Sequence, residues 1–351
     1  MDSRIQSWAE SAEEAQRTLD ARYWNPSLNM YDILTPCPNG DCNTIFHYWW
    51  MAHAVEALTD GWERTRDIFY KERLSQLYRG LLARNDGEWP NALYDDMEWM
   101  ALAWLRAYEA IGDEAYKEAA LVLWADIKTG WNEHMGGGIA WQKSQLDYKN
   151  TPANAPAVIL AARLYRAFGD QDNLRWANKI FEWQKQTLVD PVTGFVWDGV
   201  NRQGDGVIDK DWKFTYCQGV YIGAAVEMFR ATGEQVYLTE AARTWEAALD
   251  ELTSPESGLF PAEGQGDGGL FKGIFARYAA QLALALANKE GEAITAVLLN
   301  NAATMWRSGR SPRTALFGAH WDQQPSEPVD LSTQLCGVIL LEAAALLENK
   351  A

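Results

Sequence analysis

The chain is poor in cysteine and histidine, with four of each among 351 residues. Four cysteines are too few to staple a protein of this size, and Cys336 falls in an apolar segment as a packing residue. Cys37 and Cys42 are close enough to close a small loop, and the sequence leaves open whether they do. No Cys/His spacing is typical of a zinc site, and residues 205–209 lack the ligand spacing of a calcium loop. We therefore expect no metal and no other cofactor.

Long apolar runs and clusters of positive charge are also missing. No continuous run approaches the roughly 18 apolar residues that cross a bilayer, so we expect no membrane insertion. The formal net charge is −17, and no Lys/Arg cluster offsets it. The electrostatic field of this negative charge repels phosphate backbones and polyanionic glycans. It therefore excludes nucleic acid as a partner and favours a neutral glycan.

Residues 1–8 lack the apolar stretch and the cleavage site of a secretory signal. As written, the chain is expected to be cytoplasmic, and it would be secreted if a leader had been trimmed. Composition shows no break along the sequence, so we expect one domain over residues 1–351. A monomer is also expected, and the sequence leaves the oligomeric state open.

The chain is rich in tryptophan, with eighteen residues, and much of its sequence has helical periodicity. Segments with apolar residues at helical spacing recur in pairs, and each pair is joined by a tight turn that contains glycine. We expect these turns at Asp60-Gly61, Gly112-Asp113, Gly169-Asp170, Gly233-Glu234 and Gly291-Glu292.

The first helix of each pair is apolar on nearly all sides, which is typical of an inner position, whereas the second has a charged face and should lie outside. Inner helices are expected to start near residues 45, 95, 152, 216, 271 and 330. Outer helices are expected near 62–84, 113–128, 171–187, 235–251 and 290–306, and residues 3–21 supply the sixth. The pattern predicts an all-α (α/α)6 toroid with short strands confined to loops such as 194–197.

Connection lengths predict which end of the toroid is functional. The long connections, at 22–44, 129–150, 188–214, 252–269 and 307–329, all precede inner helices. They therefore gather at one rim, and function concentrates on such loops.

Asp95 and Asp96 open the second inner helix at that rim. Glycoside cleavage uses two neighbouring carboxylates, one at the anomeric carbon and one that moves protons at the glycosidic oxygen. The helix N-terminus favours an ionised nucleophile, and like-charge repulsion then raises the pKa of its neighbour. The alternative is helix capping, because Asp95-x-x-Glu98 matches a capping box. The residues alone leave both interpretations open.

Other rim segments combine polar groups that suit sugars with aromatic side chains; they are 43–50, 136–141, 149–154, 214–219 and 270–278. The glycine run at 136–138 is not a phosphate cradle, because it lacks the flanking strand and helix. His47 and His320 are the histidines expected at the rim.

Together these motifs resemble those of glycoside hydrolase family 76, the endo-α-1,6-mannanases of bacteria and fungi. The resemblance runs from about residue 43 to 280 and rests on Tyr94-Asp95-Asp96-Met97-Glu98-Trp99, Gly136-Gly137-Gly138-Ile139 with Trp141, Lys149-Asn150-Thr151 with Asn154, Thr215-Tyr216-Cys217-Gln218-Gly219 and Lys272-Gly273-Ile274-Phe275. It implies an (α/α)6 fold and retaining hydrolysis of α-1,6-mannosidic bonds in mannan or mannooligosaccharides, without a cofactor.

The resemblance assigns Asp95 as the nucleophile and Asp96 as the general acid/base. Together with the rim positions, it gives the expected sugar contacts as His47, Trp99, Trp141, Lys149, Asn150, Asn154, Tyr216, Gln218 and Lys272. Cys217 departs from the family, which commonly has Asn there, and this puts a polar contact at that subsite in doubt.

Two other classes of protein share this architecture. An (α/α)6 sugar epimerase or isomerase would rely on paired histidines, and the chain offers His47, His53, His134 and His320 with no evident pair. A non-catalytic glycan-binding protein could retain the cleft without turnover. The sequence leaves open the natural source of the mannan, the preferred chain length and the balance of internal and terminal cleavage.

Overall fold

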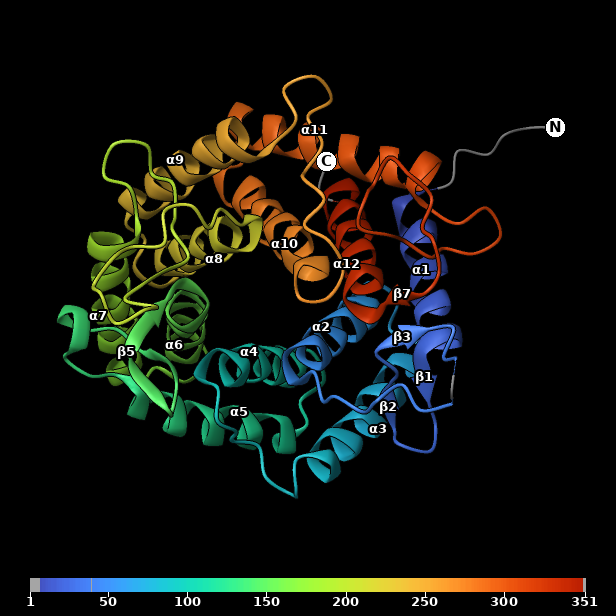
Figure 1. The fold of residues 1–351 in the computed structure, drawn as a ribbon, viewed down its shortest axis with the longest axis horizontal. Coiled ribbons are helices and arrows are strands. Elements are labelled where there is room, and N and C mark those ends of the chain that lie inside the picture. Colours follow the sequence, from blue (N-terminus) through green and yellow to red (C-terminus); the bar gives the residue numbers. More distant parts are fainter. Residues whose placement is uncertain (1–6, 39, 350–351) are drawn as a thin grey trace.

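The computed structural model describes residues 7–38 and 40–349. In these residues twelve α-helices form a closed ring of inner and outer layers (Figure 1). The inner helices are α2 (Tyr48–Thr65), α4 (Tyr94–Ile111), α6 (Ala155–Phe168), α8 (Thr215–Thr232), α10 (Gly268–Leu286) and α12 (Leu331–Glu348). The outer helices are α1 (Trp8–Tyr23), α3 (Ile68–Arg84), α5 (Glu114–Ile127), α7 (Gln171–Leu188), α9 (Gln235–Leu252) and α11 (Lys289–Thr304). The predicted (α/α)6 toroid is confirmed; of the outer helix expected at 3–21, residues 3–6 lie outside the described residues.

The inner helices are buried on nearly all sides, as their apolar composition predicts. The most apolar of them is α12, which by length and composition could cross a membrane, but 89% of it is buried inside the ring. Polar residues such as Ser332 and Gln334 interrupt its sequence, so α12 contains no long continuous apolar run; both residues are fully buried.

Three of the five expected turns lie where the glycines predict them, since Gly112, Gly169 and Gly233 end α4, α6 and α8 in the left-handed conformation. The other two predictions are wrong. Gly61 lies inside α2, whose C-cap is Arg66 in the left-handed conformation, and a Cβ at Gly61 would come 2.3 Å from the Tyr70 ring. Gly291 lies inside α11, and the turn before it is made by Ala287 in the left-handed conformation. Both glycines serve close packing rather than chain reversal.

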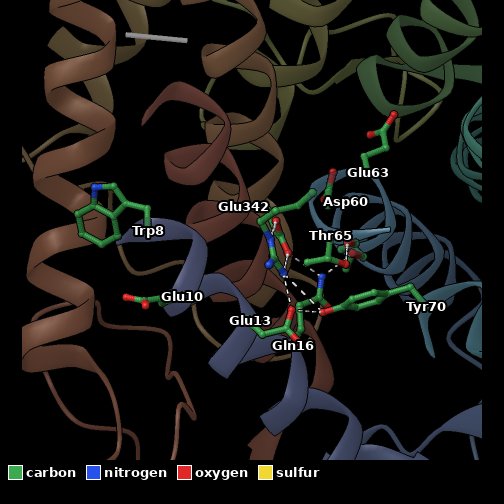
Figure 2. A network of polar contacts seen from close by, with 12 residues as sticks. Trp8, Glu10, Glu13, Gln16, Asp60, Glu63, Thr65, Tyr70 and Glu342 are labelled. Atoms are coloured by element: carbon green, nitrogen blue, oxygen red, sulfur yellow. Dashed lines mark hydrogen bonds and ion pairs between the residues drawn. The ribbon is translucent and has the colours of Figure 1, made fainter. Parts of the chain in front are cut away.

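The first and last helices close the ring side by side (Figure 1). The backbone N–H of Trp8 in α1 donates to Glu348 Oε2 of α12 at 3.0 Å. Arg64 at the end of α2 pairs with both Glu13 of α1 and Glu342 of α12, each at 2.9 Å, and Figure 2 shows these two carboxylates converging with Tyr70. One guanidinium therefore links the first two helices of the chain to the last one.

A second ion-pair network fills the end of the ring where the inner helices finish. Arg106 of α4 contacts Glu56 at 2.6 Å and Asp60 at 2.5 Å, and it also contacts Glu63. Arg277 of α10 pairs with Asp60 at 2.6 Å. These charges occupy the far end of the ring from the long loops.

Side-chain amides at the starts of inner helices hold the long loops in place. Gln218 in α8 accepts from the backbone N–H of Val196 at 2.8 Å and donates to its carbonyl at 2.7 Å. Asn154, just before α6, bonds both backbone groups of Ile139 at 2.8 and 3.0 Å. Gln334 holds another loop in the same way at α12. Each amide supplies the two hydrogen bonds that a neighbouring strand would otherwise provide.

The strands are short and lie in the loops, as predicted. An antiparallel sheet of β4 (Ala140–Gln142), β5 (Gln145–Asn150) and β6 (Gly199–Val200) flanks the start of α6. Two further pairs join β1 (Trp24–Asn25) to β2 (Met30–Tyr31) and β3 (Leu34–Thr35) to β7 (Val329–Asp330). The segment 194–197 forms no named strand and contributes a single bridge between Val189 and Val196. Cys37 and Cys42 form a disulfide, which settles the pairing that the sequence left open.

Candidate active site

A cleft of about 400 Å³ opens at the rim where the inner helices begin. Its walls come from the starts of α2, α4, α8 and α10, from the β4–β5–β6 sheet and from the loop before α8. The lining residues are Phe46, His47, Tyr48, Trp49, Leu93, Asp95, Asp96, Trp99, Trp141, Asn150, Pro152, Asp198, Arg202, Trp212, Phe214, Tyr216, Asp267 and Phe271.

Most of the site residues that the sequence suggested meet in this cleft. The structure brings together His47, Asp95, Asp96, Trp99, Trp141, Asn150 and Tyr216, which come from five separate segments. His320 does not line the cleft and is exposed elsewhere on the rim.

Four predicted sugar contacts lie behind the cleft wall instead. Lys149 is fully buried, and its Nζ donates to the carbonyl of Gly138 at 2.8 Å; burial lowers the pKa of this lysine to about 7. Lys272 is buried over the Trp321 ring, with Nζ 4.2 Å from the ring centroid. Lys272 Nζ also donates to the carbonyl of Ala319. Asn154 and Gln218 are the buried amides that hold loops. This corrects the expectation that all four contact sugar, because all four are buried and bonded to backbone groups.

Asp95 is fixed by two hydrogen bonds. Its Oδ1 accepts the backbone N–H of Asp96 at 3.0 Å, and its Oδ2 accepts Nε1–H of Trp141 from β4, also at 3.0 Å. The N-cap residue of α4 is Leu93, with no side-chain cap, so the capping-box interpretation of Asp95 and Glu98 is wrong. Both aspartates lie in the first turn of the helix and line the cleft.

The two aspartates have different electrostatic surroundings. Burial in the cleft raises the pKa of Asp95 to about 7, and the hydrogen bonds from Asp96 and Trp141 limit that rise. Burial also raises the pKa of Asp96, and the negative charges of Asp95 and Asp267 raise it further, while a hydrogen bond with Asn91 opposes them. The favourable effect of the helix N-terminus, expected to keep Asp95 acidic, is therefore outweighed by desolvation. When the pair holds one proton, that proton belongs on Asp96.

Asp198 anchors the wall behind Asp95. Its carboxylate accepts from the hydroxyls of Tyr216 at 3.1 Å and Tyr148 at 3.2 Å, and it pairs with Arg202. Cys217 is fully buried with its thiol 3.6 Å from Asp198. Cys217, the residue at which this sequence differs from the family pattern, therefore contacts Asp198 and does not reach the cleft surface.

Aromatic rings form the remaining walls. Tyr216 stacks on Phe271 with ring centroids 4.0 Å apart. Trp212 is 46% exposed, and the guanidinium of Arg202 lies 3.8 Å from its ring centroid. Flat apolar faces beside carboxylates suit the C–H surfaces and hydroxyls of a sugar chain.

Sequence reasoning missed four polar or aromatic cleft residues, namely Asp198, Arg202, Trp212 and Asp267. A signal was available for Asp267, because it directly precedes an inner helix at the same rim as Asp95. The other three lie in the long loop 188–214, where no periodicity fixes the direction of a side chain.

Replacing Trp141 with phenylalanine is expected to lower kcat roughly tenfold, because a hydrogen bond to a charged group is lost. That bond lowers the pKa of Asp95, so its loss raises the pKa and moves the acidic limb of the pH–rate profile to higher pH. Kinetics from pH 4 to 9 check this. Trp212→Phe is the matched control, since Trp212 donates to neither aspartate; an unmoved limb in Trp141→Phe would contradict the role.

Comparison with known protein families shows to which family this chain belongs. The model for glycosyl hydrolase family 76 matches residues 7–351. This chain belongs to glycosyl hydrolase family 76. The resemblance drawn from the rim motifs is thereby confirmed.

Two solved structures are similar to this family member over almost its whole length. One is an inactive variant of the α-1,6-mannanase GH76A of Salegentibacter sp. HEL1_6, with two consecutive aspartates replaced by asparagine, in complex with α-1,6-mannotriose. It is 42% identical with a TM-score of 0.92, covering 97% of this chain and 100% of that one. The other, Lin0763 of Listeria innocua, is also 42% identical with a TM-score of 0.92, covering 98% of this chain and 99% of that one.

Curated relatives match over shorter stretches. Mannan endo-1,6-alpha-mannosidase DCW1 of Candida glabrata is 33% identical over 112 residues, which is 30% of this chain and 25% of that protein. The Saccharomyces cerevisiae protein of the same name is 29% identical over 155 residues, or 41% of this chain and 34% of that protein. The matched segments thus span about a quarter to a third of these two yeast proteins.

Proposed function

We propose that this protein is a retaining glycoside hydrolase that cleaves α-1,6-mannosidic bonds in mannan or mannooligosaccharides. The observation that carries the proposal is the Asp95–Asp96 pair in an aromatic cleft. A mannanase 42% identical to this chain is inactive when two consecutive aspartates are replaced. The negative charge of the chain agrees with a neutral substrate.

In the first step Asp95 attacks the anomeric carbon while Asp96 donates its proton to the glycosidic oxygen. The C–O bond to the leaving sugar breaks, a bond from Asp95 to the anomeric carbon forms, and Asp96 becomes a carboxylate. The hydrogen bonds from Trp141 and from the helix backbone hold Asp95 in place for attack.

In the second step water attacks the anomeric carbon of the mannosyl–enzyme. Asp96, now ionised, takes a proton from this water, and the bond to Asp95 breaks. Two inversions at one carbon give net retention. The step restores a carboxylate on Asp95 and a proton on Asp96, which is the protonation state that their surroundings favour.

The epimerase alternative lacks its histidine pair. Among the described residues His47 is the one histidine in the cleft, and it stacks on Trp50 with centroids 3.9 Å apart. His53 lies buried below the cleft, and burial lowers its pKa to about 3. His134 and His320 are exposed outside the cleft. The proton-transfer groups in the cleft are therefore carboxyls.

The proposal is tested by incubating the protein with linear α-1,6-mannan and α-1,6-mannotetraose and separating the products by chromatography. Matched α-1,2- and α-1,3-linked mannooligosaccharides serve as substrate controls, and the Asp95→Asn variant serves as the enzyme control. We expect short α-1,6-mannooligosaccharides from the first two substrates alone. Binding of mannotetraose without cleavage would instead support the non-catalytic glycan-binding alternative.

A further inference from the structure

Asp267 differs from the other aspartates that precede helices in this fold. Asp67, Asp113 and Asp170 each accept a backbone N–H from the helix that follows them. Asp267 stands at the same position before α10 but makes no such bond. Its carboxylate is free of the usual capping role and lines the cleft.

Two tryptophans hold the Asp267 carboxylate in the cleft wall. Oδ1 accepts Nε1–H of Trp49 at 3.0 Å and Nε1–H of Trp50 at 2.9 Å, both from the start of α2. Two indole donors on one oxygen join α10 to α2 across the ring. Because Trp50 is buried, the position of this carboxylate is set by the core of the protein.

The charge of Asp267 has no positive partner. Among residues 7–38 and 40–349 it forms no ion pair, whereas the other extra carboxylate in the cleft, Asp198, pairs with Arg202. His47 lies close enough to feel the charge of Asp267, but burial lowers its pKa, so it is neutral at neutral pH. No cation among these residues therefore offsets the negative charge that Asp267 places in the cleft.

Asp267 acts on one member of that pair. Its negative charge bears on Asp96, while that of Asp198 bears on Asp95. Among the described residues, the charges that raise the pKa of Asp96 are those of Asp95 on α4 and Asp267 before α10, and the Tyr48 hydroxyl on α2 lies close enough to feel the charge of Asp96. Of these, Asp267 is the one fixed charge that takes no part in the bond-making steps.

We propose that Asp267 is a positioning residue for the reaction: held by Trp49 and Trp50, its carboxylate keeps Asp96 in the protonated form that donates to the glycosidic oxygen. The inference rests on the proposed function, in which Asp96 is the general acid. Once Asp95 is ionised, the negative charge of Asp267 makes loss of the proton on Asp96 less favourable. This widens the pH range in which Asp96 can donate a proton to the glycosidic oxygen.

The kinetic test is Asp267→Asn, which keeps the size of the side chain and removes its charge. We expect the basic limb of the kcat/KM profile on α-1,6-mannotetraose to move to lower pH, with the acidic limb unmoved. Each unit of displacement costs about tenfold in rate on that limb. The control is Asp322→Asn, which removes the same charge from an exposed rim position outside the cleft. A change in KM with both limbs unmoved would overturn the proposal and make Asp267 a sugar contact.

A second test does not depend on activity. In an Asp95→Asn background, ¹³C-labelled aspartate reports the titration of the Asp96 carboxyl by NMR, and its signal is identified by its loss in Asp96→Asn. Adding Asp267→Asn should lower the titration midpoint of Asp96, and thermal unfolding checks that the fold is kept. An unchanged midpoint would overturn the inference even in an active mannanase. A lowered midpoint in a protein that cleaves no mannan would uphold the electrostatic link and reject the proposed function.

Discussion

Asparagine in place of either Asp95 or Asp96 is expected to lower kcat on α-1,6-mannotetraose by about 10³-fold or more, with the fold retained. Loss of Asp95 removes the group that bonds to the anomeric carbon, and loss of Asp96 removes the proton donor. Steady-state kinetics and circular dichroism on both variants measure the effect. Full activity in either variant would contradict the assignment of the pair.

Azide distinguishes the roles of the two residues. With an activated aryl α-mannoside, azide should rescue Asp95→Gly by attacking the anomeric carbon directly, which gives the β-mannosyl azide. In Asp96→Gly the covalent intermediate still forms, and azide should attack it to give the α-mannosyl azide. The opposite pattern of products would mean that the nucleophile and the acid/base are exchanged.

Replacing Arg106 with methionine is expected to lower the free energy of unfolding by about 3–5 kcal/mol. The side chain fits the same space, but Glu56, Asp60 and Glu63 lose their shared partner, and Arg277 alone cannot neutralise them. Chemical unfolding at pH 7 measures the change. Arg175→Met is the control, because Arg175 is 71% exposed in an ordinary surface pair, and its loss should cost less than about 1 kcal/mol.

The same network predicts a pH dependence of stability. Burial would raise the pKa of Glu56 and Asp60, but the charges of Arg106 and Arg277 outweigh burial and lower both. Their contribution is therefore complete above the unfolded pKa values of about 4 and is lost as the pH falls through the folded values. The difference between wild type and Arg106→Met should be largest at neutral pH and should shrink below pH 4. A constant difference across this range would contradict the electrostatic origin of the effect.

The helical layout was predictable because inner and outer helices carry different periodic patterns, and these depend on local sequence alone. The two turns that were placed wrongly show the limit of that reasoning. A glycine at a chain reversal and a glycine under the ring of Tyr70 look alike in sequence, and only tertiary packing separates Gly112 from Gly61. Arg66 and Ala287 end helices in the left-handed conformation, which their residue types do not predict.

The carboxylate pair was predictable because adjacent acids at a helix start are visible in the sequence, whereas the direction of loop side chains is not. Lys149 and Gln218 sit in the expected segments but turn away from the cleft to bond backbone groups. Asp198 and Asp267 turn toward it from loops without periodicity. Buried backbone groups hold the lysine and the amide, whereas tyrosine hydroxyls and indole N–H groups hold the two aspartates. These partners come together only in the folded chain.

Early-time NMR of α-1,6-mannotetraose hydrolysis tests the central claim most directly. It shows both whether the α-1,6 bond is cleaved and which anomer is released first. We expect the wild-type protein to release mannooligosaccharides first as the α-anomer, before mutarotation, and Asp95→Asn to release none. Release of the β-anomer first would contradict the covalent role of Asp95. No release of either anomer by the wild-type protein would contradict the proposed hydrolysis of α-1,6-mannosidic bonds.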